Sequence, residues 1–228
     1  MNQRPIAPGE APVPQYLTRP LADAPAAAQP FGRRSWLAWI AATTIGWAVA
    51  EVLYRTLVEE IPFTSLLRGG IGVGVFMAVF QALVLRRHLG RPVRWILASG
   101  VVAVLASPVE ASALANVYTA YGPGAAFAAS MALTSLAVGL LAGTLQWLVL
   151  RRHVKRAAWW IPASALAMVA GMPLAGFAAM LALAILDVFS GIDIDPSVLG
   201  LAHGLAAAIT YAAITGYTLL RLFRSPLS

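Results

Sequence analysis

Apolar residues occur in six long runs along the chain, separated by short clusters of glycine, proline and charged residues. Each run approaches or exceeds the roughly 20 residues that a helix needs to cross about 30 Å of hydrocarbon. The pattern predicts an all-α polytopic membrane protein with six transmembrane helices, at about 36–57, 63–85, 93–115, 125–150, 159–189 and 198–223. The fifth run is long enough to require a tilt or a kink, for which Pro162 and Pro173 offer positions.

One eight-residue phrase occurs twice and closes two of these runs. Residues 81–88 read Gln-Ala-Leu-Val-Leu-Arg-Arg-His, and residues 146–153 read Gln-Trp-Leu-Val-Leu-Arg-Arg-His, 65 positions later. A degenerate copy, Gly-Tyr-Thr-Leu-Leu-Arg, lies at 216–221. Subtracting 59 from the residue number of Trp95 gives Trp36, which relates the second hairpin to the first. Because internal repetition is the signature of a repeated structural unit, the sequence predicts three helical hairpins, each ending in arginine at one membrane face.

The composition agrees with a membrane protein. Hydrophobic residues make up 60% of the 228 positions and charged residues 11%, with a mean hydropathy of +0.76. A soluble domain carries roughly 25% charged residues, so this chain has too few to cover a surface that faces water. The chain has no cysteine, which excludes disulfides, thiol catalysis and iron–sulfur ligation.

The first 32 residues differ from the rest. They contain seven prolines and few large apolar residues. Proline at this density blocks helix formation, and little apolar surface is available to bury. We expect a disordered Pro/Ala-rich cytoplasmic tail at 1–32, followed by the transmembrane domain at 33–228.

The net charge of +7 has an uneven distribution. Lysine and arginine gather in the segments that precede the first run and follow the second, fourth and sixth, at Arg33, Arg34, Arg86–Arg94, Arg151–Arg156, Arg221 and Arg224. This is the pattern of cytoplasmic loops, and it predicts a bacterial inner-membrane protein with both termini in the cytoplasm. A nucleic-acid-binding protein would instead carry a basic patch on a polar folded face. Six tryptophans near the basic ends predict an interfacial aromatic belt: Trp36, Trp39, Trp95, Trp147, Trp159 and Trp160.

Ionisable residues within the predicted spans are functional candidates, because burying them in hydrocarbon is costly. Helix rise places Glu51, Arg68, Glu110 and His203 in one layer near the opposite face, and the offset of 59 also relates Glu110 to Glu51. This layer could line a small outward-facing polar vestibule. The interpretation that we favour is a structural cluster of ion pairs that sets the helix register.

The polar residues nearer the basic face have simpler interpretations. We expect Gln81 and Gln146 to make interhelical hydrogen bonds, which commonly join membrane helices. The predicted head-group contacts, with anionic lipids on the cytoplasmic side, are Arg86, Arg87, Arg151 and Arg152. No spacing of His, Asp and Glu resembles a zinc site, and no metal is predicted.

His203 allows two further hypotheses, although no cofactor is predicted. Its small neighbours in Gly-Leu-Ala-His-Gly leave room for a chlorophyll or haem macrocycle. A histidine in the last of six spans also occurs in intramembrane serine proteases of the rhomboid family. Their Gly-x-Ser-Gly motif is absent here, where Thr134-Ser135 occupies the fourth run, so a Ser–His dyad would lack its usual turn.

The phrase at 146–153, followed by Ala-Trp-Trp-Ile-Pro-Ala-Ser, resembles uncharacterised bacterial multi-span membrane proteins with repeated Gln-Trp-x-x-Leu-Arg-Arg segments. The resemblance covers the second to fifth runs and implies a fold type but no activity.

The functional prediction is a non-enzymatic accessory, scaffold or assembly subunit of a membrane complex, with membrane-protein partners. Short loops, the absence of a nucleotide motif and glycine-rich faces such as Gly139-x-x-x-Gly143 all favour helix packing against partners. The alternatives are a small transporter or channel-like protein that uses the Glu/Arg/His layer, and, third, an intramembrane enzyme.

Overall fold

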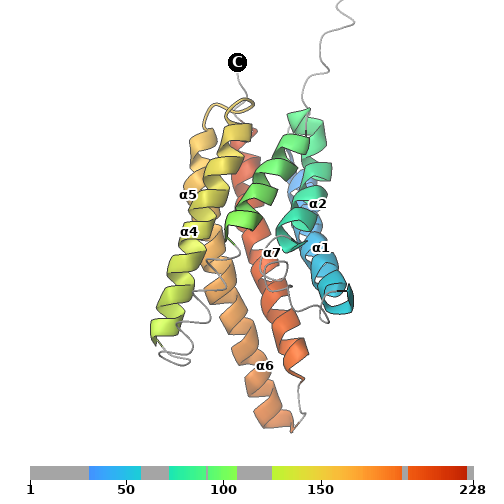
Figure 1. Cartoon of the computed structure of the whole chain (residues 1–228), viewed down its shortest axis with the longest axis vertical. Helices are drawn as coiled ribbons and strands as arrows, with labels where there is room; N and C mark the ends of the chain where they lie inside the picture. The colour runs from blue at the N-terminus through green and yellow to red at the C-terminus, as the bar shows by residue number, and fades with distance from the viewer. Residues whose placement is uncertain (1–30, 58–71, 91, 107–124, 192–194, 225–228) are drawn as a thin grey trace, which may run out of the picture.

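The computed structural model describes residues 31–57, 72–90, 92–106, 125–191 and 195–224 (Figure 1). The elements within these ranges are helices: α1 (Arg33–Leu57), α2 (Gly72–Leu89), a helix at Val93–Ala106, α4 (Ala125–Leu150), α5 (Trp160–Val169), α6 (Gly176–Ser190) and α7 (Pro196–Leu222). The predicted tail up to residue 30 lies outside the described residues, as do Arg68 and Glu110. The all-α fold class is confirmed for the described part of the chain.

Helical segments long and apolar enough to cross a membrane occur at Arg33–Leu53, Ala128–Leu150, Ala157–Ser190 and Val198–Leu222, which makes four in the described ranges. They correspond to the first, fourth, fifth and sixth predicted spans. The helix Val93–Ala106 is shorter but also apolar. The predicted second and third spans extend into 58–71 and 107–124, which lie outside the described residues. The structure therefore supports a multi-pass membrane protein.

The long fifth segment changes helix type at the second of its two prolines. Pro162 lies in the first turn of α5, where a missing backbone N–H removes no intrahelical hydrogen bond. Pro173 lies inside a π-helical turn, Ala170–Ala175, which separates α5 from α6. Such a turn absorbs the hydrogen bond and the space that proline disturbs. The expected irregularity is therefore at Pro173, and the helix continues through Pro162.

The helices pack in chain order and close into a ring. The helix Val93–Ala106 packs against α2 through the Gly74–Ala103 contact, and against α4 through Val102 and Val138. Contacts also join α1 to α2, α4 to α5, α5 and α6 to α7, and α7 back to α1. Figure 1 shows the C-terminal end of α7 and the α4–α5 connection at one end of this arrangement. The inward faces of the ring therefore surround a shared central space.

Glycines set the closest approaches between helices. A Cβ atom placed on Gly139 would lie 2.6 Å from the Cα atom of Ala165, and one on Gly143 would lie 2.8 Å from that of Ile161. Small residues allow such approaches in lipid, where no hydrophobic force assembles helices. The predicted Gly-x-x-x-Gly face thus packs α4 against α5 within the chain, so its glycines are buried in an internal contact.

We expect Gly139→Ala to lower the free energy of unfolding by about 1–2 kcal/mol, because the new methyl group meets backbone atoms that cannot move aside. Denaturation of the purified protein in mixed micelles measures this. The control is Gly100→Ala, where the nearest atom to a new Cβ is Val75 Cγ2 at 3.8 Å. That variant should keep or raise stability, since alanine favours helix. Equal losses in the two variants would contradict close packing at Gly139.

Candidate functional site

Three tryptophans form a buried cluster toward the basic end of the bundle. Trp39, Trp95 and Trp160 are each 0% exposed. Their rings meet edge to face, with centroid separations of 5.9 Å (Trp39–Trp95), 6.3 Å (Trp39–Trp160) and 5.6 Å (Trp95–Trp160). Edge-to-face contacts place the positive ring edge against a negative ring face, which stabilises aromatic clusters beyond their buried area. The three rings join α1, the helix Val93–Ala106 and α5.

Each indole of this cluster donates a hydrogen bond to a side chain on another helix. The Nε1 bonds run from Trp95 to Gln81 Oε1 (3.1 Å), from Trp160 to Gln146 Oε1 (2.9 Å) and from Trp39 to Thr215 Oγ1 (3.0 Å). A buried indole N–H needs such an acceptor, since an unpaired donor in an apolar interior is costly. The acceptors lie on α2, α4 and α7, so the three bonds continue around the ring.

The two glutamine carboxamides extend these bonds to a third helix each. Gln81 Nε2 donates to Thr43 Oγ1 at 3.1 Å, and Gln146 Nε2 donates to Ser99 Oγ at 3.0 Å. Both glutamines are buried. Gln81 and Gln146 therefore make interhelical hydrogen bonds, each joining a tryptophan, a hydroxyl group and its own helix.

The burial of these tryptophans corrects two sequence-based expectations. Trp39, Trp95 and Trp160 do not belong to an interfacial belt, because buried glutamines and a threonine satisfy their N–H groups inside the bundle. Trp159 is 66% exposed and remains a candidate for that belt. The tryptophan that clusters with Trp95 is Trp39, at an offset of 56; the offset of 59 pointed wrongly to Trp36.

A sequence signal for the cluster was present but was missed. The pattern Trp-Ile-x-Ala-Ser/Thr occurs at 39–43, 95–99 and 160–164. It puts a hydroxyl group one helical turn after each buried tryptophan, on the same helix face. Thr43 and Ser99 receive glutamine N–H groups in this way, while the Ser164 hydroxyl lies near Tyr211 without a well-aligned hydrogen bond.

A central cavity lies beside this cluster, on the side away from the basic turns. Its volume is about 330 Å³. The two glutamines and Ser99 line it, and Ser99 follows the buried Trp95 by one turn. All parts of the ring except α6 contribute lining residues, most of them alanine, glycine, valine and methionine. The two glutamines, which accept the Trp95 and Trp160 N–H groups, therefore form one end of a largely apolar cavity together with Ser99.

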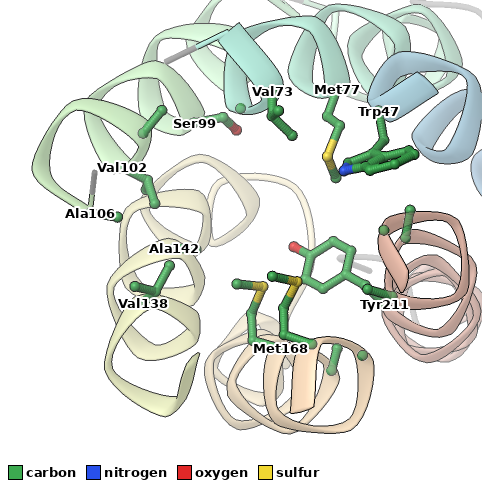
Figure 2. Close-up of a pocket in the computed structure, with 18 of the residues that line it drawn as sticks. Trp47, Val73, Met77, Ser99, Val102, Ala106, Val138, Ala142, Met168 and Tyr211 are labelled. Atoms are coloured by element: carbon green, nitrogen blue, oxygen red, sulfur yellow. The ribbon is translucent and has the colours of Figure 1, made fainter. Parts of the chain in front are cut away.

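Larger side chains form the walls of the cavity. Figure 2 shows Trp47 and Met77 on one side of the space, facing Tyr211 and Met168 on the other. Methionine is unbranched and polarisable, so it adapts to guests of different shape. Glu51 also lines the cavity and follows Thr43 by eight residues, so it lies about 12 Å further along the helix axis. The glutamines and Glu51 therefore lie at different depths of the space, and the Tyr211 hydroxyl is a further polar group in its wall.

The glutamine end can recognise a polar group on a guest. A carboxamide has two N–H donors and two acceptor lone pairs. The bonds of Gln81 and Gln146 to tryptophan, threonine and serine use one donor and one lone pair of each. Each carboxamide can therefore accept or donate a further hydrogen bond, which suits a hydroxyl or carbonyl group better than an ion.

The structure separates the two described members of the predicted polar layer. Glu51 lines the cavity, whereas His203 does not. The His203 ring packs against α6, where a Cβ atom on Gly176 would lie 2.5 Å from its Cε1 atom. The absence of a side chain at Gly176 therefore lets the His203 ring pack against α6 within the chain. The remaining members, Arg68 and Glu110, fall outside the described residues.

Other candidate residues lie away from the cavity. Arg86, Arg87, Arg151 and Arg152 are exposed, in or just after the last turns of α2 and α4. Ser135, in the predicted protease alternative, is buried on α4 and does not line the cavity. Within the ranges that the structure covers, no three His, Asp or Glu side chains gather as metal ligands.

No protein-family model, curated protein or solved structure matches the chain. The resemblance to bacterial multi-span membrane proteins stays a prediction. The cavity and the tryptophan cluster therefore provide the structural features that bear on function.

Proposed function

We propose that this chain is a non-enzymatic membrane protein that holds a small, largely apolar molecule in its central cavity. The observation that carries the proposal is the cavity of about 330 Å³, with two buried carboxamides at one end. That volume falls at the lower end of the range for small-molecule sites, which are mostly apolar with a few placed polar groups. A guest with an apolar body and one hydroxyl or carbonyl group fits this chemistry.

The proposed architecture has six spans in three hairpins, with both termini on the cytoplasmic side of a bacterial inner membrane. The recurrence of one hydrogen-bond pattern supports it. In the first and second hairpins, a glutamine in the second helix accepts a tryptophan N–H from the first helix of the next hairpin. In the third hairpin, Thr215 in the second helix accepts the N–H of Trp39 from the first hairpin. The basic residues that flank the helices support the orientation.

Ligand binding accounts for the geometry better than scaffolding does. The glycine face on α4 that favoured packing against partners is occupied by α5. If the protein is an accessory subunit of a membrane complex, it would contribute the molecule that it binds. An intramembrane enzyme is less favoured, because Glu51, the described cavity residue that could act as a base, lies about 12 Å along the helix axis from the level of the glutamines and Ser99.

Glu51 supports one second candidate, a small transporter. Glu51 lies in the cavity wall, about 12 Å along the axis of α1 from Thr43, which is the hydrogen-bond partner of Gln81. Intramembrane carboxylates commonly mark substrate or proton pathways. Transport would need water or substrate to pass Glu51, so Glu51→Gln should abolish flux in proteoliposomes if this candidate holds. If the protein only retains a ligand and does not transport it, the unmodified protein should show background flux in the same proteoliposome assay.

The experiment is purification of the full chain in gentle detergent, followed by solvent extraction and mass spectrometry of the extract. We expect one apolar compound in near-stoichiometric amount. Ala142→Trp, which fills the cavity, should lose at least about nine-tenths of it, since a filled apolar site cannot hold its guest. The matched control is Ala137→Trp, on the exposed face of the same helix α4, which should retain the compound.

Ala142→Leu gives a smaller obstruction and guards against unfolding of the tryptophan variant. Retention of the same compound by folded Ala142→Trp or Ala142→Leu protein would contradict the proposal. An extract of the unmodified protein that contains bulk phospholipid alone would contradict it as well.

A further inference from the structure

A second hollow lies on the outside of the bundle, between α5 and α7 near the basic end. It is a groove with a volume of about 890 Å³. Its apolar floor includes Pro162, Ala163 and Leu166 from α5 and Ile214 from α7. Leu166 is 61% exposed, so this floor is open to the surroundings of the helices. In a membrane, those surroundings are acyl chains.

Three arginines line the groove at the basic end of the bundle. Arg156 precedes α5, Arg221 lies in the last turn of α7 and Arg224 follows that helix by two residues, and all three are exposed. No aspartate or glutamate is present among the described lining residues. Tyr217 holds Arg221 in place, because its hydroxyl oxygen accepts a hydrogen bond from Arg221 Nε at 2.8 Å and its ring lies under the guanidinium at 5.1 Å. The groove therefore concentrates positive charge at one end.

Aromatic rings mark the level at which the charge meets the apolar floor. Trp159 is 66% exposed and Tyr217 is 48% exposed, and both line the groove. Exposed tryptophan and tyrosine favour the head-group level of a bilayer. Leu166 follows Trp159 by seven residues, which places it about 10 Å deeper along α5. The groove thus presents positive charge, then aromatic rings, then an apolar floor. This is the order in which a phospholipid presents its phosphate head group, its glycerol and its acyl chains.

We propose that this groove binds one anionic phospholipid, with its phosphate on Arg156, Arg221 and Arg224 and its acyl chains along the floor near Leu166. Guanidinium groups bind phosphate through paired, charge-assisted hydrogen bonds. The apolar floor favours a lipid over a soluble phosphate, because the latter would leave the floor uncovered. This site is distinct from the arginines of the sequence prediction: Arg86, Arg87, Arg151 and Arg152 do not line the groove.

The test is native mass spectrometry of the full chain in detergent, titrated with phosphatidylglycerol or with phosphatidylcholine of the same chains. We expect a first phosphatidylglycerol to bind at least about tenfold more tightly than phosphatidylcholine. Arg156→Gln/Arg221→Gln/Arg224→Gln should lose that preference, with about fivefold weaker binding for each arginine removed. The matched control removes three exposed arginines elsewhere at the same end, as Arg86→Gln/Arg87→Gln/Arg152→Gln, and should keep the preference.

Ala163→Trp tests the floor separately, since it fills the groove while all three arginines remain. It should weaken phosphatidylglycerol binding to the level of the triple variant. Unchanged binding in this variant would overturn the proposal. Glycerol 3-phosphate that competes as well as the whole lipid would show a soluble-phosphate site and overturn it too. If the two triple variants lose the same amount of phosphatidylglycerol binding, the preference reflects net charge alone, and that result would also overturn the proposal.

Discussion

Replacing Trp160 with alanine is expected to lower the free energy of unfolding by about 3–5 kcal/mol, the range for removing a buried aromatic side chain. Trp160 is 0% exposed and contacts the rings of Trp39 and Trp95. Its loss would leave a cavity and would free the Gln146 carboxamide oxygen from its donor. Denaturation in mixed micelles, followed by circular dichroism, measures the change.

The neighbouring tryptophan supplies the control. Trp159 is 66% exposed, so Trp159→Ala should change stability by no more than about 0.5 kcal/mol. The two variants remove the same side chain from adjacent positions. Comparable losses would mean that the tryptophan cluster does not hold the helices together.

The second large effect is expected at Gln146. Replacing it with leucine should lower the free energy of unfolding by about 2–4 kcal/mol, because the Trp160 indole N–H and the Ser99 hydroxyl both lose their partner in an apolar interior. Thr144→Leu, at an exposed position on the same helix, is the control and should be nearly neutral.

A double-mutant cycle separates the lost hydrogen bond from altered packing. In a Trp160→Phe background the indole donor is already absent, so Gln146→Leu should cost less there than in the unmodified protein. An equal cost in both backgrounds would contradict the role of Gln146 as the acceptor for Trp160.

The helices were largely predictable from the sequence, because lipid leaves a chain few options. Backbone polar groups in hydrocarbon must be satisfied within the helix, so long apolar runs become helices. The predicted fourth span at 125–150 matches α4 (Ala125–Leu150), and the predicted sixth at 198–223 nearly matches α7 (Pro196–Leu222). The second and third spans cannot be compared along their full lengths, since they extend beyond the described residues.

The tryptophan cluster was not predicted, because position alone does not separate its members from an interfacial belt. Trp159 and Trp160 are adjacent in the sequence, yet one is exposed and the other is buried. The difference lies in the acceptor that reaches Trp160 from another helix, Gln146. Interhelical hydrogen bonds were expected for this glutamine, but their partner could not be identified from spacing.

The cavity was even less accessible to sequence reasoning. Ala106, Ala142 and Gly171 come from different helices, and only their convergence leaves an empty volume. The same ambiguity affects Gly139 and Gly143, whose spacing also fits a partner surface but which pack against α5 within the chain. Of the residues chosen for their charge, Glu51 alone lines the cavity among those that the structure covers.

The most direct test of the cavity proposal is a crystal structure of the full chain, purified without delipidation and grown in a lipid mesophase. The account predicts continuous, non-protein density between the Gln81 and Gln146 carboxamides that extends along Met77 and Met168 toward Glu51. A chain of ordered waters through that space to Glu51 would contradict ligand binding and favour the transporter. A cavity closed by repacked side chains would contradict both.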